Sequence, residues 1–236
     1  MAAMTMLRDR IGAAAGRLLD LALPAVCVGC GREGTPICDR CGLALRARAG
    51  VPPGVPIGMP SDVPAPLLQL DWCGPFNGVM RDALHAIKYR GDVRIAEPLG
   101  LAVAERWREA GAGGDLVVHV PVHPTRARER GYDQAERIAR VVARELGLAH
   151  RAALVRARAT TAQFSLDRAA RATNVSGAFA LANLATAGGG AAGVGGRWVL
   201  LVDDVVTTGA TLAACAEALL TAGAVGVSAV TVARER

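Results

Sequence analysis

The feature that most constrains the fold is an apolar run that ends in two adjacent acids and is followed by a threonine–glycine loop. Residues 198–211 read Trp-Val-Leu-Leu-Val-Asp-Asp-Val-Val-Thr-Thr-Gly-Ala-Thr. The run at 199–202 is short, β-branched at both ends and bounded by charge, which predicts a parallel strand buried on both faces. An alanine- and leucine-rich helix is expected from Leu212. A strand, a loop and a helix in this order are typical of an open α/β sheet.

This pattern places Asp203 and Asp204 where α/β proteins bind ligands, at the carboxyl end of a strand. The loop leads into a helix N-terminus, whose free N–H groups and dipole favour a phosphate. Carboxylates for sugar hydroxyls beside a phosphate cradle fit a phosphorylated ribose. The candidate cradle residues are Thr207, Thr208, Gly209, Ala210 and Thr211, and Gly209 lets the backbone approach a ligand closely.

An acidic strand end is also found in P-loop ATPases, but that class needs a glycine-rich loop ending in Lys-Ser or Lys-Thr. The single lysine of the chain, Lys88, is followed by Tyr89, which excludes the class. Lys88 lies near the basic end of a helix expected over 79–90. It either contacts a pyrophosphate group or is a solvated charge that stabilises the helix end.

A second strand–loop–helix unit is expected, with a strand at Leu116–Val120 and a helix whose N-terminus is capped by Asp133. The loop between them carries Arg126 and Arg130, whose forked guanidinium groups suit phosphate oxygens but equally fit a solvated surface. Residues 120–171 hold eleven arginines and five acids, an excess as large as the net charge of +6 of the whole chain. Such a segment attracts polyanions, and the nearby phosphate loop favours a small one over nucleic acid.

Four cysteines form two CxxC pairs, each followed by glycine: Cys27, Cys30, Cys38 and Cys41. Four thiolates in two tight turns predict a closed tetrahedral site for structural zinc, with rubredoxin-type iron as the main alternative metal. The alternatives without a metal are two disulfides or four thiols of no importance. A reducing compartment argues against disulfides. Cys215, inside the helix after the phosphate loop, is expected to fill the core.

Six of the twelve prolines fall within residues 50–66, which predicts a stiff linker. We therefore divide the chain into an N-terminal helix and zinc ribbon at 1–49, a linker at 50–70 and an α/β domain at 71–236. The N-terminal segment is interrupted by charged residues such as Arg17, so an amphipathic helix is expected there rather than a signal peptide. No run of about 18 apolar residues predicts membrane insertion, and we expect a cytoplasmic protein.

In sequence order, these motifs resemble the ComF family of phosphoribosyltransferase-like proteins over nearly the whole chain from Leu19 onward. The segment 199–211 looks like the motif of type I phosphoribosyltransferases that binds phosphoribosyl pyrophosphate (PRPP). The other matching parts are the two CxxC pairs, Leu84–Asp92, Pro121–Gln134, Thr160, Thr161, Gln163, Arg171, Asn174 and Phe179. The chain departs from the family at His119, where a proline is usual, and at Asp133, where asparagine is common.

The resemblance implies a type I phosphoribosyltransferase fold, which is a mostly parallel sheet with helices on both faces, preceded by the small four-cysteine zinc-ribbon module. It also implies PRPP with Mg²⁺ as the ligand and transfer to an unidentified acceptor with release of pyrophosphate. Asp203 and Asp204 would hold the ribose hydroxyls and favour the cationic sugar ring. Residues 207–211 would hold the 5′-phosphate. The groups for pyrophosphate would be Lys88, Arg126 and Arg130.

Two functional classes stay open at this point. The first is a transferase that uses PRPP. The second is a non-catalytic accessory protein that binds PRPP or single-stranded DNA, since members of the ComF family are linked to natural competence and DNA uptake. Aromatic residues make up only 3% of the chain, which argues against the usual base-stacking platform of a protein that binds single strands.

Overall fold

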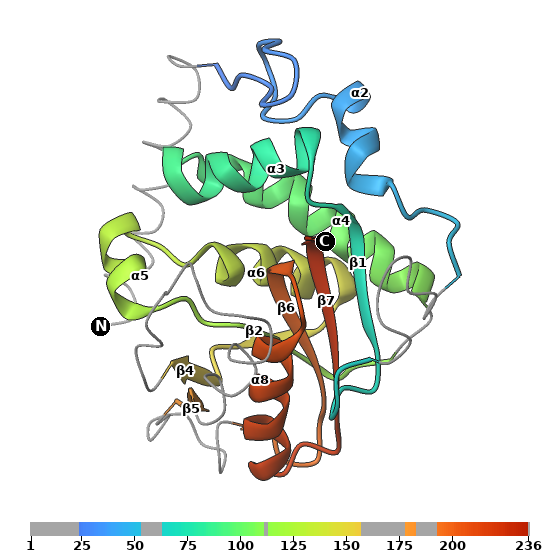
Figure 1. The fold of residues 1–236 in the computed structure, drawn as a ribbon, viewed down its shortest axis with the longest axis vertical. Coiled ribbons are helices and arrows are strands. Elements are labelled where there is room, and N and C mark those ends of the chain that lie inside the picture. Colours follow the sequence, from blue (N-terminus) through green and yellow to red (C-terminus); the bar gives the residue numbers. More distant parts are fainter. Residues whose placement is uncertain (1–23, 53–62, 111–112, 157–177, 183–192, 236) are drawn as a thin grey trace.

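The structure is a computed structural model, and it describes residues 24–52, 63–110, 113–156, 178–182 and 193–235. Its centre is a five-stranded sheet in the order β1-β7-β6-β2-β3, and every pairing within it is parallel (Figure 1). The strands are β1 (Leu70–Pro75), β2 (Leu116–His119), β3 (Ala149–Arg151), β6 (Trp198–Val206) and β7 (Gly226–Arg234). The expected mostly parallel α/β sheet is therefore confirmed.

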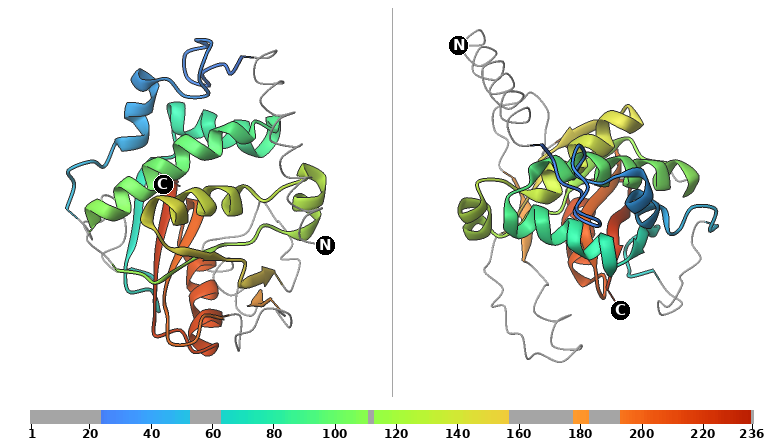
Figure 2. Two further views of the ribbon diagram at one scale, coloured as in Figure 1. Left: turned by 180° about the vertical axis from the view of Figure 1, so that it is seen from behind. Right: turned by 90° about the horizontal axis from the view of Figure 1, so that it is seen from above.

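Helices cover both faces of this sheet because its strands are apolar on both sides. Along β6, Leu200 and Val202 belong to one hydrophobic cluster, whereas Val199 and Leu201 belong to another. The first cluster is covered by α3 (Gly78–His85), α4 (Ala96–Ala110) and α6 (Gln134–Leu146), and the second by α8 (Ala210–Thr221). In the left view of Figure 2, which shows the molecule from behind, α4 and α6 lie on the near side of the sheet. Cys215 is fully buried in the second cluster, as predicted.

Shorter elements connect these layers. They are α2 (Asp39–Gly42), the 3-10 helices η1 (Leu43–Arg46) and η3 (Val93–Ile95), the π-helix η2 (Ala86–Arg90), α5 (Pro124–Arg130), β4 (Leu154–Arg156) and β5 (Phe179–Leu181). The strands β4 and β5 form a separate antiparallel pair. The helix expected over 79–90 is thus two joined pieces, α3 and η2. In the described part of the chain, no helix has the length and hydrophobicity needed to cross a membrane.

Two predicted boundaries around the acids are wrong. The strand predicted at 199–202 continues to Val206, because Val205 pairs with Ala233 and Val206 with Arg234 of β7. The two acids therefore lie within the strand, near its end. The following helix begins at Ala210 rather than at Leu212.

The segment that carries Arg126 and Arg130 is also different from the prediction. It forms the short helix α5 instead of a loop, with Pro124 at its first turn and His123 as its N-cap. His123 accepts a hydrogen bond from the Thr125 amide at 3.3 Å and is half-buried.

A buried ion pair ties the cysteine-containing segment to the edge of the sheet. Asp71 on β1 is fully buried and accepts hydrogen bonds from Arg106 of α4 at 2.7 and 3.1 Å and from Arg48 at 3.3 Å. Arg106 also donates to the carbonyl oxygens of Arg48 and Val51 at 3.0 and 2.8 Å. One side chain thereby joins a helix, an edge strand and the segment that follows the cysteines. The helix predicted before the cysteines lies outside the described residues.

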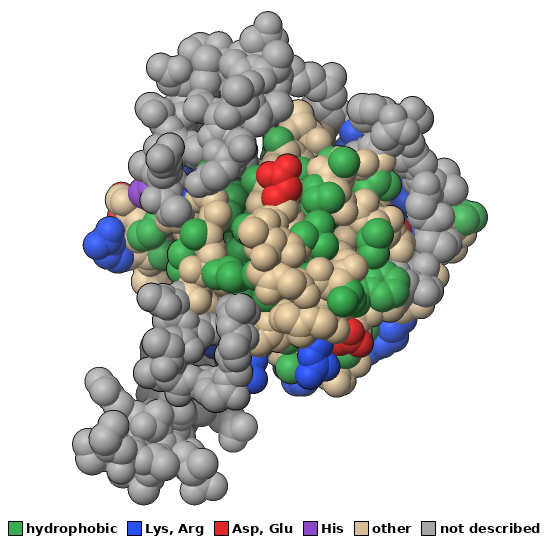
Figure 3. Space-filling view, turned by 90° about the horizontal axis from the view of Figure 1, so that it is seen from below, with side chains coloured by type: hydrophobic (Ala, Val, Ile, Leu, Met, Phe, Trp, Pro, Cys, Tyr) green, Lys and Arg blue, Asp and Glu red, His purple; other side chains and the backbone are tan. Residues whose placement is uncertain are grey.

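The predicted site residues lie at the end of the sheet where its strands finish. The arrowheads of β6 and β7 point toward the side where α3 lies (Figure 1). The opposite end, seen from below in Figure 3, shows mostly hydrophobic and uncharged side chains, with one acidic group near its centre and other charges at its margin. The charged groups described next gather at the carboxyl ends of the strands.

Candidate functional site at the carboxyl end of β6

Asp204 on β6 contacts side chains from two other elements, η2 and α6. Its Oδ1 lies 2.9 Å from Nζ of Lys88 on η2, and its Oδ2 accepts a hydrogen bond of 2.8 Å from Nε2 of Gln134 on α6. The residue is 7% exposed, so both contacts are shielded from water. The structure therefore brings Lys88, predicted as a pyrophosphate ligand, to one of the two predicted acids.

Asp203 lies on the other side of the strand, because successive residues of a strand alternate between faces. Its charge acts on Arg156 of β4 and Cys215 of α8, whereas Asp204 is held by α6 and η2. Asp203 also accepts a hydrogen bond from the Asp204 amide at 2.7 Å. The two carboxylates thus flank the end of one strand, and a ligand lying across that end can contact both.

Burial and the neighbouring Asp204 carboxylate raise the pKa of Asp203 well above its usual value. The Asp204 amide and the charge of Lys88 act in the opposite direction. Two acids that crowd each other in this way are a good receptor for hydrogen-bond donors or for a cation, because either relieves the repulsion between them. Sugar hydroxyls and a hard divalent ion both meet that description.

The threonine–glycine loop has the geometry of an anion cradle. Gly209 is the N-cap of α8 and has a φ of 81°, a left-handed conformation that glycine adopts without strain. A Cβ at this position would also lie 2.5 Å from Cγ of Pro64, so the end of the predicted linker packs against the loop. The Ala210 amide lies 3.4 Å from Oγ1 of Thr208, and Thr207 is exposed. The first amides of α8 have no partner within the helix and are available to a phosphate.

The two predicted arginines of α5 reach the site in different ways. Arg130 donates a hydrogen bond of 2.9 Å to Oε1 of Gln134, whose amide nitrogen binds Asp204. Burial and, to a smaller extent, the positive charge of Arg126 lower the pKa of the Arg156 guanidinium. Arg126 therefore acts electrostatically on Arg156. The charge of Asp203 raises the same pKa. The site is therefore acidic at its centre and basic around it.

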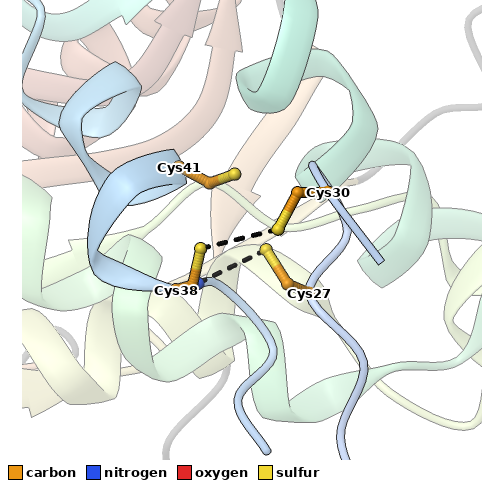
Figure 4. Close-up of side chains that lie close together, drawn as sticks. All are labelled: Cys27, Cys30, Cys38 and Cys41. Atoms are coloured by element: carbon orange, nitrogen blue, oxygen red, sulfur yellow. Dashed lines mark hydrogen bonds between the residues drawn. The ribbon is translucent and has the colours of Figure 1, made fainter. Parts of the chain in front are cut away.

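The four cysteines point toward one another (Figure 4). Their sulfur atoms all lie within 4.8 Å of one another, and Cys30 and Cys38 are 3.7 Å apart. A tetrahedral zinc with Zn–S bonds of about 2.3 Å needs sulfur atoms about 3.8 Å apart, so the set fits the ion. Burial and the neighbouring cysteines raise the pKa of the Cys41 thiol. The cluster could hold a structural metal, as predicted from the spacing.

The cysteine cluster also rests directly on α3. A Cβ at Gly29 would lie 2.8 Å from both the Cys41 sulfur and Cγ2 of Val79. Only glycine therefore fits between the cysteine cluster and α3. Val28 and Cys41 pack against the hydrophobic cluster that α3 helps to build. Seen from above in the right view of Figure 2, the cysteine-containing segment lies across α3.

Sequence reasoning did not identify the roles of Gln134 and Arg156. Gln134 lies 70 residues from Asp204 in the chain, so only the tertiary structure brings them together. Its position directly after the helix cap Asp133, and inside the motif that resembles a known family, was the available signal. Arg156 was counted only as one of many arginines.

Comparison with known proteins gives consistent relatives. The chain is 30% identical to "DNA utilization protein YhgH" of Escherichia coli (strain K12) over 209 residues, which cover 86% of each chain. It is 30% identical to the protein of the same name from Salmonella typhimurium, over 85% of each chain. No family model matches the chain.

Solved structures of an allosteric regulatory enzyme of purine biosynthesis and of glutamine PRPP amidotransferase from B. subtilis are similar, with TM-scores of 0.43 and 0.42 and sequence identities of 20% and 18%. Each match covers 64% of this chain, which spans 30% of either enzyme.

Proposed function

This chain belongs to the family of DNA utilization protein YhgH, and on the chemistry of its site we propose that it is a ComF-type, phosphoribosyltransferase-like protein that binds PRPP with Mg²⁺. One observation carries the proposal: two adjacent carboxylates flank the end of β6, and a few residues later a left-handed glycine opens the amide cradle of α8. A sugar phosphate needs both halves, with acceptors for its hydroxyls and donors for its phosphate.

The residues divide the ligand between them. Asp203 and Asp204 bind the ribose 2′ and 3′ hydroxyls, and their charge favours the cationic sugar ring that develops as the bond to pyrophosphate breaks. The amides and hydroxyls of Thr207, Thr208, Gly209, Ala210 and Thr211 bind the 5′-phosphate. Magnesium, when bound, neutralises charge on the departing pyrophosphate.

The basic residues around the acids serve the pyrophosphate. Lys88 binds Asp204 in the structure, and a sugar hydroxyl at Asp204 competes with this contact. Lys88 is then free to bind the pyrophosphate next to the ring. Arg126 and Arg130 supply further forked donors for its oxygens.

The second candidate function is that of a non-catalytic protein that binds PRPP or single-stranded DNA during DNA uptake. Two observations favour it: the relatives are named for DNA utilization, and the whole of α5, with Arg126, Arg128 and Arg130, has no buried residue. For both candidate functions, a reducing compartment keeps the four thiols of the cluster reduced. We therefore propose a cytoplasmic location.

Titration calorimetry with PRPP and Mg²⁺, followed by assay of pyrophosphate release with a panel of nitrogenous bases, tests the proposal. We expect PRPP to bind the wild-type chain and to bind the Asp203→Asn, Asp204→Asn double variant about 100-fold more weakly, since two hydrogen bonds to charged groups are lost. Glu217→Gln, an exposed acid on α8, is the matched control and should bind as the wild type does.

Release of pyrophosphate with one of the bases supports the transferase, and binding without release supports the accessory protein. Equal affinity of the double variant and the wild type would contradict the assigned roles of the acids.

A further inference from the structure

An exposed aromatic side chain lies at the rim of the site. Tyr89 on η2 is 70% exposed, whereas the tryptophans Trp72 and Trp107 and the ring of Phe179 are buried. It stands one helical turn after His85, which is also exposed, and the two rings meet edge to face with centroids 5.5 Å apart. An aromatic ring left in water beside a ligand site is available for stacking.

The ring of Tyr89 is connected to the acids by a short chain of contacts. The Arg130 guanidinium lies over the ring, 5.3 Å from its centroid. Arg130 donates to Gln134 at 2.9 Å, and Gln134 donates to Asp204 at 2.8 Å. On the other side, the preceding residue, Lys88, pairs with Asp204 at 2.9 Å. Tyr89 is therefore held next to the groups proposed to bind the sugar and its pyrophosphate.

A role in stability does not account for this placement. Tyr132, the other tyrosine, is half-buried, donates its hydroxyl to the Ile87 carbonyl oxygen and packs against the hydrophobic cluster under η2. Tyr132 thus anchors η2 to the fold. The Tyr89 ring lies on the same element but is exposed to solvent, with the Arg130 guanidinium over one face.

We propose that Tyr89, with Arg130 against its ring, is a stacking site for a nucleobase beside the acid pair. A planar, electron-poor ring stacks on a tyrosine face, and a guanidinium next to that face adds a cation–π contribution and attracts the attached phosphate or sugar phosphate. The proposal deepens the proposed function, because it gives the chemistry of the molecule that lies next to the bound sugar.

A nucleobase can come from a free base or nucleoside, or from a single strand of nucleic acid. Other side chains lie near the Tyr89 ring. The ring centroids of Phe76 and His85 are 6.0 Å apart. Arg81, His85 and Tyr89 are spaced four residues apart along α3 and η2 and form a row. This row lies beside the basic helix α5, which places Arg130 against the Tyr89 ring.

The test measures binding of two probes in the absence of PRPP: fluorescein-labelled oligothymidylate by anisotropy at low salt, and adenosine and thymidine by ligand-observed NMR. For whichever probe binds the wild type, we expect Tyr89→Ala to lower the affinity about tenfold, which is the loss typical of one stacked base. Tyr89→Phe keeps the ring and should bind like the wild type. Leu43→Ala, an exposed apolar side chain on η1, is the matched control.

Binding of the oligonucleotide alone identifies a single strand as the source of the base, and binding of the nucleosides identifies a free base. The proposal is overturned if neither probe binds, if Tyr89→Ala binds as the wild type does, or if Tyr89→Phe loses as much as Tyr89→Ala. Because no probe contains PRPP, failure here leaves the calorimetric test of the acids unaffected, and failure of that test leaves this one intact.

Discussion

At the scale of single residues, Asp203 is an acid whose burial beside Asp204 lowers the stability of the fold. Burial and the charge of Asp204 raise its pKa in the folded chain, so the folded state favours the protonated acid. As the pH rises through that pKa, ionisation destabilises the fold relative to the unfolded chain, where the acid ionises freely.

We therefore expect Asp203→Asn to stabilise the ligand-free protein by about 1 kcal/mol at neutral to alkaline pH, since the amide keeps the acceptor for the Asp204 N–H and removes the charge. Urea unfolding at several pH values measures this. The advantage should shrink as the pH falls, and a variant that is less stable than the wild type throughout would contradict the interpretation.

A second residue-scale prediction concerns two histidines on the neighbouring strands β2 and β3. Nδ1 of His119 and Nε2 of His150 lie 3.1 Å apart, and the rings are stacked. Burial and then the neighbouring His119 lower the pKa of His150 to about 4. The neutral ring is the folded form, so stability is complete above the ordinary histidine pKa of about 6.5 and is lost as the pH falls from there through 4.

His150→Gln should flatten the acid side of the stability profile between those two values, while the profile above neutral pH keeps its shape. Thermal melts across this range would show it. An unchanged acid slope would mean that the histidine pair does not limit acid stability.

The sequence alone singled out the two acids and the four cysteines as candidate site residues, because each set is contiguous or closely spaced in the chain. The partners of those residues were not predictable in the same way. Gln134 and Arg156 reach the acids from other strands and helices, and nothing local marks a glutamine as the partner of an aspartate 70 residues away.

At the scale of elements, α3 and η2 form one rod between the cysteine cluster and the acid pair. Its first turn carries Val79, which packs beside the Gly29 turn, and its last turn carries Lys88, which binds Asp204. Order that a metal imposes on the cysteines would therefore reach the other end.

Removal of the metal with a chelator in reducing buffer should raise amide hydrogen exchange in residues 78–90 as well as in 24–52, with α8 unchanged as the internal control. Mass spectrometry of peptic fragments resolves these segments. Faster exchange confined to 24–52 would mean that the cysteine module is independent of the site.

Elements with a clear apolar period were predictable, and elements defined by long-range contacts were not. The helix α6 begins after its N-cap Asp133 and ends at Leu146, before its C-cap Gly147. The short α5 has no buried residue and hence no apolar period to detect. The sequence placed the end of β6 too early, because the two acids interrupt the apolar run. Only the pairing with β7 shows that the strand continues past them.

At the scale of the whole molecule, the alternation of apolar and polar segments was enough to predict a mostly parallel sheet with helices on both faces. The attachment of the cysteine module was not, since it depends on a buried ion pair between residues far apart. The division at residues 49 and 70 stays a prediction, although Ile37 and Leu45 lie in the same hydrophobic cluster as α3 and α4.

The buried ion pair gives a prediction for the global fold. Asp71→Ala leaves Arg48 and Arg106 buried without their carboxylate, and we expect a loss of about 3 kcal/mol in the free energy of unfolding. Glu217→Ala, at an exposed helix position, should change it by less than about 0.5 kcal/mol. Urea unfolding compares the two, and similar small losses would show that the pair does not hold the sheet edge.

The central claim is that the acid pair and the glycine loop together bind one sugar phosphate. The most direct test is the melting temperature of the wild type and of the Asp203→Asn, Asp204→Asn double variant, each with and without PRPP and Mg²⁺. A ligand that binds only the folded chain raises the melting temperature. We predict a rise for the wild type and none for the double variant, and an equal rise in both proteins would contradict the claim.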